Sequence, residues 1–128
     1  MTSKTFKKSQ RLLLASSYQN VFTNVEFKSG GKYLLFLVCG NELSIGRLGL
    51  AISKKHLKKA VDRNRVKRLV RVSFQENQHR LKYLDIVVLL RNNRSALATN
   101  EQINNELDQL WKQTIKQVEK SVLIRPLN

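Results

Sequence analysis

Basic side chains crowd a short stretch of this sequence, AVDRNRVKRLVRVSF at residues 60–74. The only acid in the stretch is Asp62. The basic residues are Arg63, Arg65, Lys67, Arg68 and Arg71. Like charges this close repel one another, so we expect a partner outside the chain to compensate them. Arginine suits phosphate in particular, because its planar guanidinium group donates to two oxygens at once. The chemistry that this stretch indicates is phosphate binding.

Helical periodicity separates these charges from the apolar residues around them. We expect a helix over residues 57–78, in which successive residues are turned by about 100°. One side then carries the apolar side chains of Val66, Leu69, Val70 and Phe74. The other side carries the polar side chains of Asn64, Lys67, Arg68 and Arg71. Solvated helix faces usually mix both signs, whereas residues 53–75 hold nine Lys or Arg and one acid. A polyanionic partner is therefore favoured over a merely solvated face.

The charge excess extends to the whole chain. Lys and Arg number 24 and Asp and Glu number 9, which leaves a net charge of +15. Such a field attracts nucleic acids and anionic membranes. The longest apolar run, YLLFLVC at residues 33–39, is too short to span a bilayer, and the N-terminus has no signal-peptide core. We therefore expect a cytoplasmic protein without a membrane partner, in which the single cysteine, Cys39, is buried.

The pattern of elements predicts one domain over residues 1–128, with an ordered core at about 11–118 and loose tails at 1–10 and 121–128. Strands are expected at 26–28, 32–39, 45–53 and 84–91. Helices are expected after Ser16 or Ser17, at 57–78, and from Thr99, where Gln102 completes a capping box. The order is αβββαβα, an α+β fold with helices packed on a small four-stranded sheet.

Three aromatic residues are candidates for a different kind of RNA contact. Tyr18 and Phe22 lie in the first expected helix, and Phe36 lies in the first long strand. Unpaired bases stack on such rings and gain about 1–3 kcal/mol each. The spacing alone leaves ordinary core packing open as the alternative.

The segment SKKHLKKAVDRNRVKRLVR at residues 53–71 resembles the signature of the protein subunit of bacterial ribonuclease P. The resemblance continues outside it, in RLLLASSYQNVF at 11–22, RLGLAIS at 47–53 and LDIVVLLR at 84–91. It covers about residues 11–118.

The resemblance implies a fold and a function. The fold is a two-layer α/β sandwich with a left-handed βαβ crossover, like the second domain of ribosomal protein S5. The function is to assist a catalytic RNA in removing the 5′ leader from precursor tRNA. The residues implied to face the RNA subunit are Lys54, Lys55, Arg63, Asn64, Arg65 and Arg68. Those implied to line a cleft for the single-stranded leader are Tyr18, Phe22, Phe36, Lys67 and Arg71.

No catalytic or metal-binding residues are expected in this chain itself. Its acids are scattered, and His56 and His79 lack the spacing of metal ligands. The resemblance places the endonuclease chemistry in the RNA, with Mg²⁺, and implies no cofactor on the protein. Two alternatives are a general or ribosomal RNA-binding protein without a role in tRNA processing, and a stand-alone metal nuclease.

Overall fold

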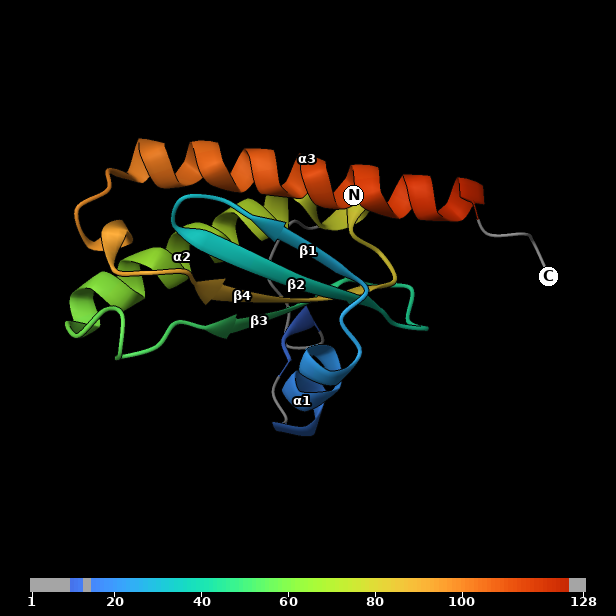
Figure 1. The fold of residues 1–128 in the computed structure, drawn as a ribbon, viewed down its shortest axis with the longest axis horizontal. Coiled ribbons are helices and arrows are strands. Elements are labelled where there is room, and N and C mark those ends of the chain that lie inside the picture. The colour runs from blue at the N-terminus through green and yellow to red at the C-terminus, as the bar shows by residue number, and fades with distance from the viewer. Residues whose placement is uncertain (1–9, 13–14, 125–128) are drawn as a thin grey trace.

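The computed structural model describes residues 10–12 and 15–124 and shows a four-stranded sheet with helices packed against it (Figure 1). The elements are α1 (Ala15–Thr23), β1 (Phe27–Gly30), β2 (Leu34–Gly40), β3 (Arg47–Ala51), α2 (Ala60–Asn77), β4 (Leu84–Leu90) and α3 (Asn100–Ile124). Two 3₁₀ turns, η2 (Gln78–Arg80) and η3 (Arg94–Ala96), flank β4. The expected order αβββαβα and the α+β class are confirmed.

The strands lie in the order β1-β2-β4-β3, so β2 and β4 form the centre of the sheet. β2 is antiparallel to both β1 and β4, whereas β3 is parallel to β4. The outer side of β3 is partly covered by the N-terminal segment, because the Leu12 amide donates to the Leu48 carbonyl oxygen at 3.1 Å. The sheet is therefore mixed, and α2 connects its one parallel pair.

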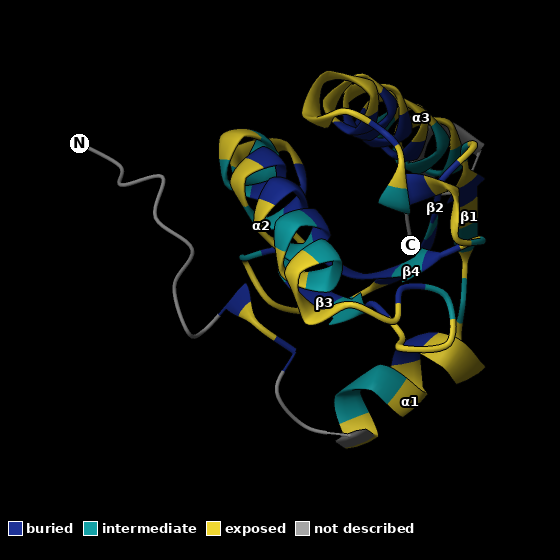
Figure 2. Ribbon diagram, turned by 90° about the vertical axis from the view of Figure 1, so that its left-hand side faces the viewer, coloured by how far each residue is buried: buried dark blue, intermediate teal, exposed yellow. Residues whose placement is uncertain are grey.

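Helices cover both faces of the sheet. Figure 2 shows α2 and α3 on one face and α1 on the other. The two-layer description is therefore incomplete. The reason lies in β2, where Phe36 and Val38 point to the side of α2 and α3 while Leu37 and Cys39 point to the side of α1. Both sets are apolar, so both faces need a cover.

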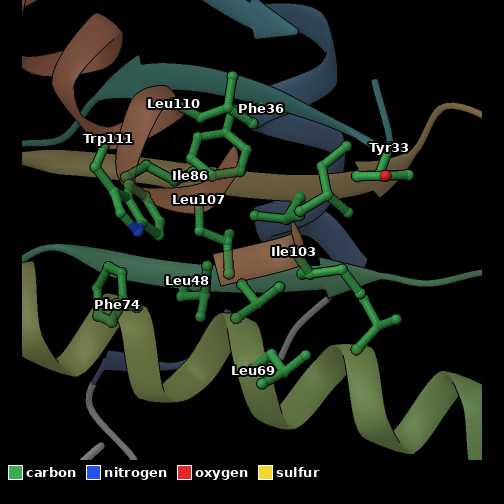
Figure 3. Close-up of a cluster of buried hydrophobic side chains, with 14 of the residues drawn as sticks. Tyr33, Phe36, Leu48, Leu69, Phe74, Ile86, Ile103, Leu107, Leu110 and Trp111 are labelled. Carbon is green, nitrogen blue, oxygen red and sulfur yellow. The ribbon is translucent and has the colours of Figure 1, made fainter. Parts of the chain in front are cut away.

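The larger core lies between the sheet and the pair α2 and α3 (Figure 3). Trp111 of α3 occupies its centre and is 1% exposed. Its indole Nε1–H donates to the Ser73 hydroxyl of α2 at 2.6 Å, and its ring lies edge-on to Phe74 at 6.0 Å. These contacts orient α2, because they determine which side of that helix is buried and which remains outside.

Helix boundaries follow local signals with two exceptions. The Thr99 and Gln102 capping box is confirmed, with hydrogen bonds of 2.9 and 3.1 Å in the two directions. α2 begins at Ala60, three residues later than expected, because Lys59 adopts an extended backbone before it. α3 continues to Ile124, so the first residues of the expected C-terminal tail are helical. Residues 1–9 and 125–128 of the expected tails lie outside the described part of the chain.

Within the residues that the structure describes, no helix has the combination of length and apolar character needed to cross a membrane.

Candidate nucleic-acid interface

The outer side of α2 is cationic, as its periodicity predicts. Val66 and Val70 are fully buried, which leaves the opposite side of the helix facing solvent. There, Asn64 and Arg68 are exposed, and Lys67 and Arg71 are half-buried. The connection that precedes the helix adds four exposed lysines, Lys54, Lys55, Lys58 and Lys59. We call this set of exposed and half-buried side chains the basic face.

The basic face has no internal compensation in the part of the chain that the structure describes. No Lys or Arg of α2 lies within 4.0 Å of a carboxylate there. Among the described residues, an ion pair joins Arg47 of β3 to Asp85 of β4 at 2.6 Å, with Asp85 almost completely buried. Unpaired exposed cations generate a positive potential that attracts phosphate groups.

Arg63 and Arg65 are different, because their guanidinium groups bind the protein's own backbone. Arg63 Nη1 donates to the carbonyl oxygens of Leu57 and Lys58 at 2.9 and 2.8 Å. This closes the turn before α2. Since a guanidinium group has five N–H donors, Arg63 retains donors for an external ligand.

Arg65 joins α2 to the connection between β4 and α3. Its Nη2 donates to the Ser95 carbonyl oxygen and its Nη1 donates to Asn100 Oδ1, both at 2.8 Å. The two arginines of the signature therefore hold two loops in place. The family resemblance implied that they face the RNA subunit together with Lys54, Lys55, Asn64 and Arg68. It could not reveal this second role, because their acceptors are backbone and amide oxygens outside α2.

Tyr18 lies directly on β3. Its hydroxyl oxygen accepts a hydrogen bond from the Leu50 amide at 3.1 Å. Gly49 makes this approach possible, since a Cβ there would lie 2.7 Å from Cε1 of the Tyr18 ring. Phe22, one helical turn further along α1, is 42% exposed. α1 thus presents one half-buried ring, Tyr18, against the edge strand β3 and one exposed ring, Phe22, to solvent.

The assignment of Phe36 to the same cleft is wrong. Its ring is fully buried on the opposite face of the sheet, 4.5 Å from the ring centre of Trp111. Figure 3 shows it between β2 and α3, near Ile86 and Leu110. Base stacking on this ring would require the core to open, so core packing, which the spacing had left open, is its role.

Lys67 and Arg71 lie on the flank of α2 that is turned away from α3. Helical geometry places Lys67 about 160° from Arg65, which faces the start of α3. Figure 2 shows α2 and α1 on opposite faces of the sheet, both near β3. The helix that carries the two cations therefore lies on one face of the sheet, and Tyr18 contacts β3 from the other face.

Two buried acids that the sequence analysis did not single out have structural roles. Asp85 accepts from Arg47 and also from the Asn41 side chain at 2.7 Å, and this contact raises the pKa of Arg47. Glu106 accepts the backbone amides of Tyr33 and Leu34 at 2.9 and 2.8 Å. The sequence signal for both is an acid on an apolar face, in LDIVVLL of β4 and in the buried stripe of α3.

The described side chains that face solvent at this surface are of the types that bind nucleic acid. They supply charge, hydrogen-bond donors and aromatic rings. Among the residues that the structure describes, no three His, Cys, Asp or Glu side chains are grouped so that they could share a metal ion. These features define a class, a small and strongly basic α+β protein with the surface of an RNA-binding protein.

Comparisons with known proteins identify the family within that class. The family model for ribonuclease P matches residues 6–115. The ribonuclease P protein component of Chromohalobacter salexigens is 45% identical over 120 residues, which cover 94% of this chain and 93% of the relative. The protein component of Pseudomonas aeruginosa is 41% identical over 116 residues, covering 91% and 85% of the two chains.

Solved structures agree. The ribonuclease P protein of Staphylococcus aureus superposes with a TM-score of 0.76 at 29% identity, covering 84% of this chain and 96% of that one. The protein of Thermotoga maritima gives a TM-score of 0.70 at 29% identity, with coverages of 80% and 96%. The chain belongs to the bacterial ribonuclease P protein family. It is a subunit of the ribonuclease P holoenzyme, a tRNA-processing endoribonuclease, and membership implies the ribonuclease P RNA as its partner.

Proposed function

We propose that this chain binds the ribonuclease P RNA through one part of its basic face and, through Lys67 and Arg71 of the same face together with α1, holds the 5′ leader of precursor tRNA along the β3 edge. The RNA-subunit contacts are Lys54, Lys55, Asn64 and Arg68, with Arg63 and Arg65 placing the flanking loops. The leader contacts are Tyr18, Phe22, Lys67 and Arg71. The single observation that carries this proposal is the row of exposed and half-buried cations on α2 and on the connection before it, none of which is paired with a carboxylate of a described residue.

The contribution of the protein is electrostatic. Its cations neutralise RNA phosphates and release condensed counterions, which lowers the Mg²⁺ concentration needed to hold two RNAs together. We assign the Mg²⁺ of the holoenzyme to the RNA subunit, since the described side chains group no set of carboxylates for it. Mg²⁺ held there supplies the cleavage chemistry, and this chain binds and orients the substrate.

Leader binding makes the protein selective for precursor tRNA. Exposed Phe22 offers a face on which an unpaired base can stack, and stacking is tolerant of base identity. Lys67 and Arg71 add contacts to the leader backbone from the other side of β3. Mature tRNA lacks the leader and gains none of these contacts, so the difference in affinity favours the substrate over the product.

The hand of the βαβ crossover, the number of domains and the cellular location belong to the same proposal. We infer a left-handed crossover from β3 through α2 to β4, which would be an exception to the usual hand of such units. The adjacency and parallel direction of β3 and β4 support a βαβ unit here. We also infer that the chain is one domain over residues 1–128 and acts in the cytoplasm. An experimental structure would test the hand of the crossover.

The test is cleavage of precursor tRNA at low Mg²⁺ by the ribonuclease P RNA, with and without this protein. A third reaction contains the protein alone. We expect cleavage only in the mixture. RNA binding without stimulation would contradict the proposed role of the basic face and of the leader contacts in cleavage. Cleavage by the protein alone would mean that it carries a nuclease site of its own.

The basic face is tested by Arg68→Ala, which removes an exposed cation that makes no hydrogen bond or ion pair with a described residue. We expect weaker binding to the RNA subunit and a salt slope reduced by about one counterion. Lys112→Ala, on an exposed position of α3, makes the same change in charge and is the matched control. An unchanged salt slope for Arg68→Ala would remove that residue from the interface.

A further inference from the structure

Cations from three connections meet at one end of the sheet. Leu34 pairs with Leu90 and Ala51 pairs with Leu89, so the start of β2 and the ends of β3 and β4 lie together. Figure 1 shows the loops β1–β2, β3–α2 and β4–α3 at this end, with the starts of α2 and α3. The three loops, residues 31–33, 52–59 and 91–99, contain seven Lys or Arg and no Asp or Glu. These seven exposed residues are Lys32, Lys54, Lys55, Lys58, Lys59, Arg91 and Arg94.

The connection between β4 and α3 is held in place by its neighbours. Arg65 binds it from α2 through Ser95 and Asn100. On its other side, the Asn92 side chain donates to the Lys32 carbonyl oxygen at 3.0 Å. A loop that is already fixed loses less conformational entropy when it binds a partner. This connection is therefore a preorganised surface beside α2.

Arg94 is the cation that this connection leaves available. Its side chain is exposed and makes no hydrogen bond or ion pair with any residue that the structure describes. Its backbone amide is bound to Asn92 Oδ1 at 2.9 Å, which anchors the residue from which the guanidinium group extends. An anchored arginine with all five donors free is suited to bind a phosphate group through two oxygens.

The position of Arg94 favours the RNA subunit over the leader as its source of phosphate. The β4–α3 connection meets the flank of α2 that carries Arg65. Lys67 and Arg71, the proposed leader contacts, lie on the opposite flank. The cations of the connection and the lysines before α2 therefore form one continuous positive surface. We assign those lysines to the RNA subunit, so the same partner is expected for Arg94.

We propose that the β4–α3 connection, residues 91–99, is a second contact element for the ribonuclease P RNA, in which Arg94 binds a backbone phosphate and Arg65 is the positioning residue that places the connection beside α2. This inference rests on the proposed function, because it extends the RNA-binding surface of α2. The sequence signal was present as RNNR at residues 91–94, but its distance from the signature in the chain concealed that the two are neighbours.

The first experiment compares Arg94→Ala with Arg80→Ala in the full chain. Arg80 is exposed in η2, before β4 and thus at the opposite end of the sheet, so the two variants match in charge and residue type. Binding to the ribonuclease P RNA is titrated at several salt concentrations. We expect Arg94→Ala to lower affinity about tenfold and the salt slope by about one, with Arg80→Ala within about twofold of wild type. Equal behaviour of the two variants would overturn the proposal.

The second experiment separates the two possible sources of phosphate. Assembled holoenzyme is titrated with precursor tRNA that carries a leader and with the same tRNA without one. We expect Arg94→Ala to leave the ratio of the two affinities unchanged, because it acts on the RNA subunit. A loss confined to the leader-bearing substrate would overturn the assignment and make Arg94 a leader contact.

The third experiment tests positioning by a double-mutant cycle. If Arg65 places the connection, the loss caused by Arg94→Ala is smaller in an Arg65→Ala background, and the two effects are less than additive. Additive losses would overturn the positioning role. Arg65→Lys, which keeps the charge, replaces Arg65→Ala in the cycle if the alanine variant does not fold.

These outcomes also separate this inference from the proposed function. If Arg68→Ala weakens RNA binding and Arg94→Ala does not, only the proposal that the β4–α3 connection contacts the RNA is contradicted. If neither variant changes RNA binding, the proposal that the basic face of α2 binds the RNA is contradicted as well.

Discussion

The guanidinium group of Arg65 donates to the carbonyl oxygen of Ser95 over 2.8 Å and thereby connects α2 to the loop before α3. The partner is 30 residues away in the chain, and the same guanidinium group also reaches Asn100. A residue of the RNA-binding signature is thus also part of the framework that determines where the RNA-binding loops lie. Substitutions in the signature therefore have to be assayed for stability as well as for RNA affinity.

Arg65→Lys should lower the free energy of unfolding by about 1–2 kcal/mol, because one ammonium group does not reproduce the two bonds of the planar fork. Arg68→Lys should change it by less than about 0.5 kcal/mol, since Arg68 is exposed and has no described partner. Both variants keep the net charge. Urea titration followed by circular dichroism measures the difference. Equal stability of the two variants would contradict a stabilising role for the hydrogen bonds of Arg65 to Ser95 and Asn100.

Phe36→Ala and Phe22→Ala should separate packing from binding. Removing the buried Phe36 ring leaves a cavity beside Trp111 and should cost about 3–5 kcal/mol of stability. Removing the exposed Phe22 ring should cost less than about 1 kcal/mol. Phe22→Ala should instead weaken binding of holoenzyme to leader-bearing precursor, with leaderless tRNA as the control. A Phe22 variant with unchanged discrimination would show that this ring does not contact the leader.

Glu106→Gln should destabilise the turn between β1 and β2. The Glu106 carboxylate lies against Gly31, where a Cβ would be 2.3 Å from its carboxyl carbon, and accepts the Tyr33 and Leu34 amides. The amide NH₂ of Gln replaces one acceptor with a donor, so a buried N–H loses its partner. We expect a loss of about 3 kcal/mol. Glu119→Gln, exposed on the same helix, should be neutral in the same denaturation experiment.

Cys39 should be unreactive in the folded protein. Burial, assisted by the negative charges of Asp85 and Glu26, raises the pKa of its thiol from 9.0 to about 11. At pH 8 a thiol reagent such as Ellman's should label the unfolded chain rapidly and the folded chain only through opening. Rapid labelling of folded protein would contradict the burial of this side chain.

The same raised pKa predicts a pH dependence of stability. Because the folded state holds the thiol proton more tightly than the unfolded state does, this contribution is fully present below pH 9 and is lost as pH rises towards about 11. Cys39→Ala should lack this part of the decline. The measurement is the free energy of unfolding of both proteins between pH 8 and pH 11.

Local patterns were sufficient for the elements themselves. The capping box of Thr99 and Gln102 and the apolar side of α2 both depend on residues near one another in the chain. The basic signature at residues 53–71 was sufficient to identify the family. These signals are short-range or compositional, so they can be read without knowing how the elements pack.

The sequence by itself determined the order of helices and strands, the charge excess and the family. Only the tertiary structure decided which face Phe36 occupies and which partners Arg63 and Arg65 bind. Phe36 was ambiguous because both faces of β2 are apolar, so alternation along the strand does not say which set meets α1 and which meets α3. The partners of Arg65, and the meeting of its helix with Arg94, depend on contacts between distant segments, which form only when the sheet and α3 have brought them together.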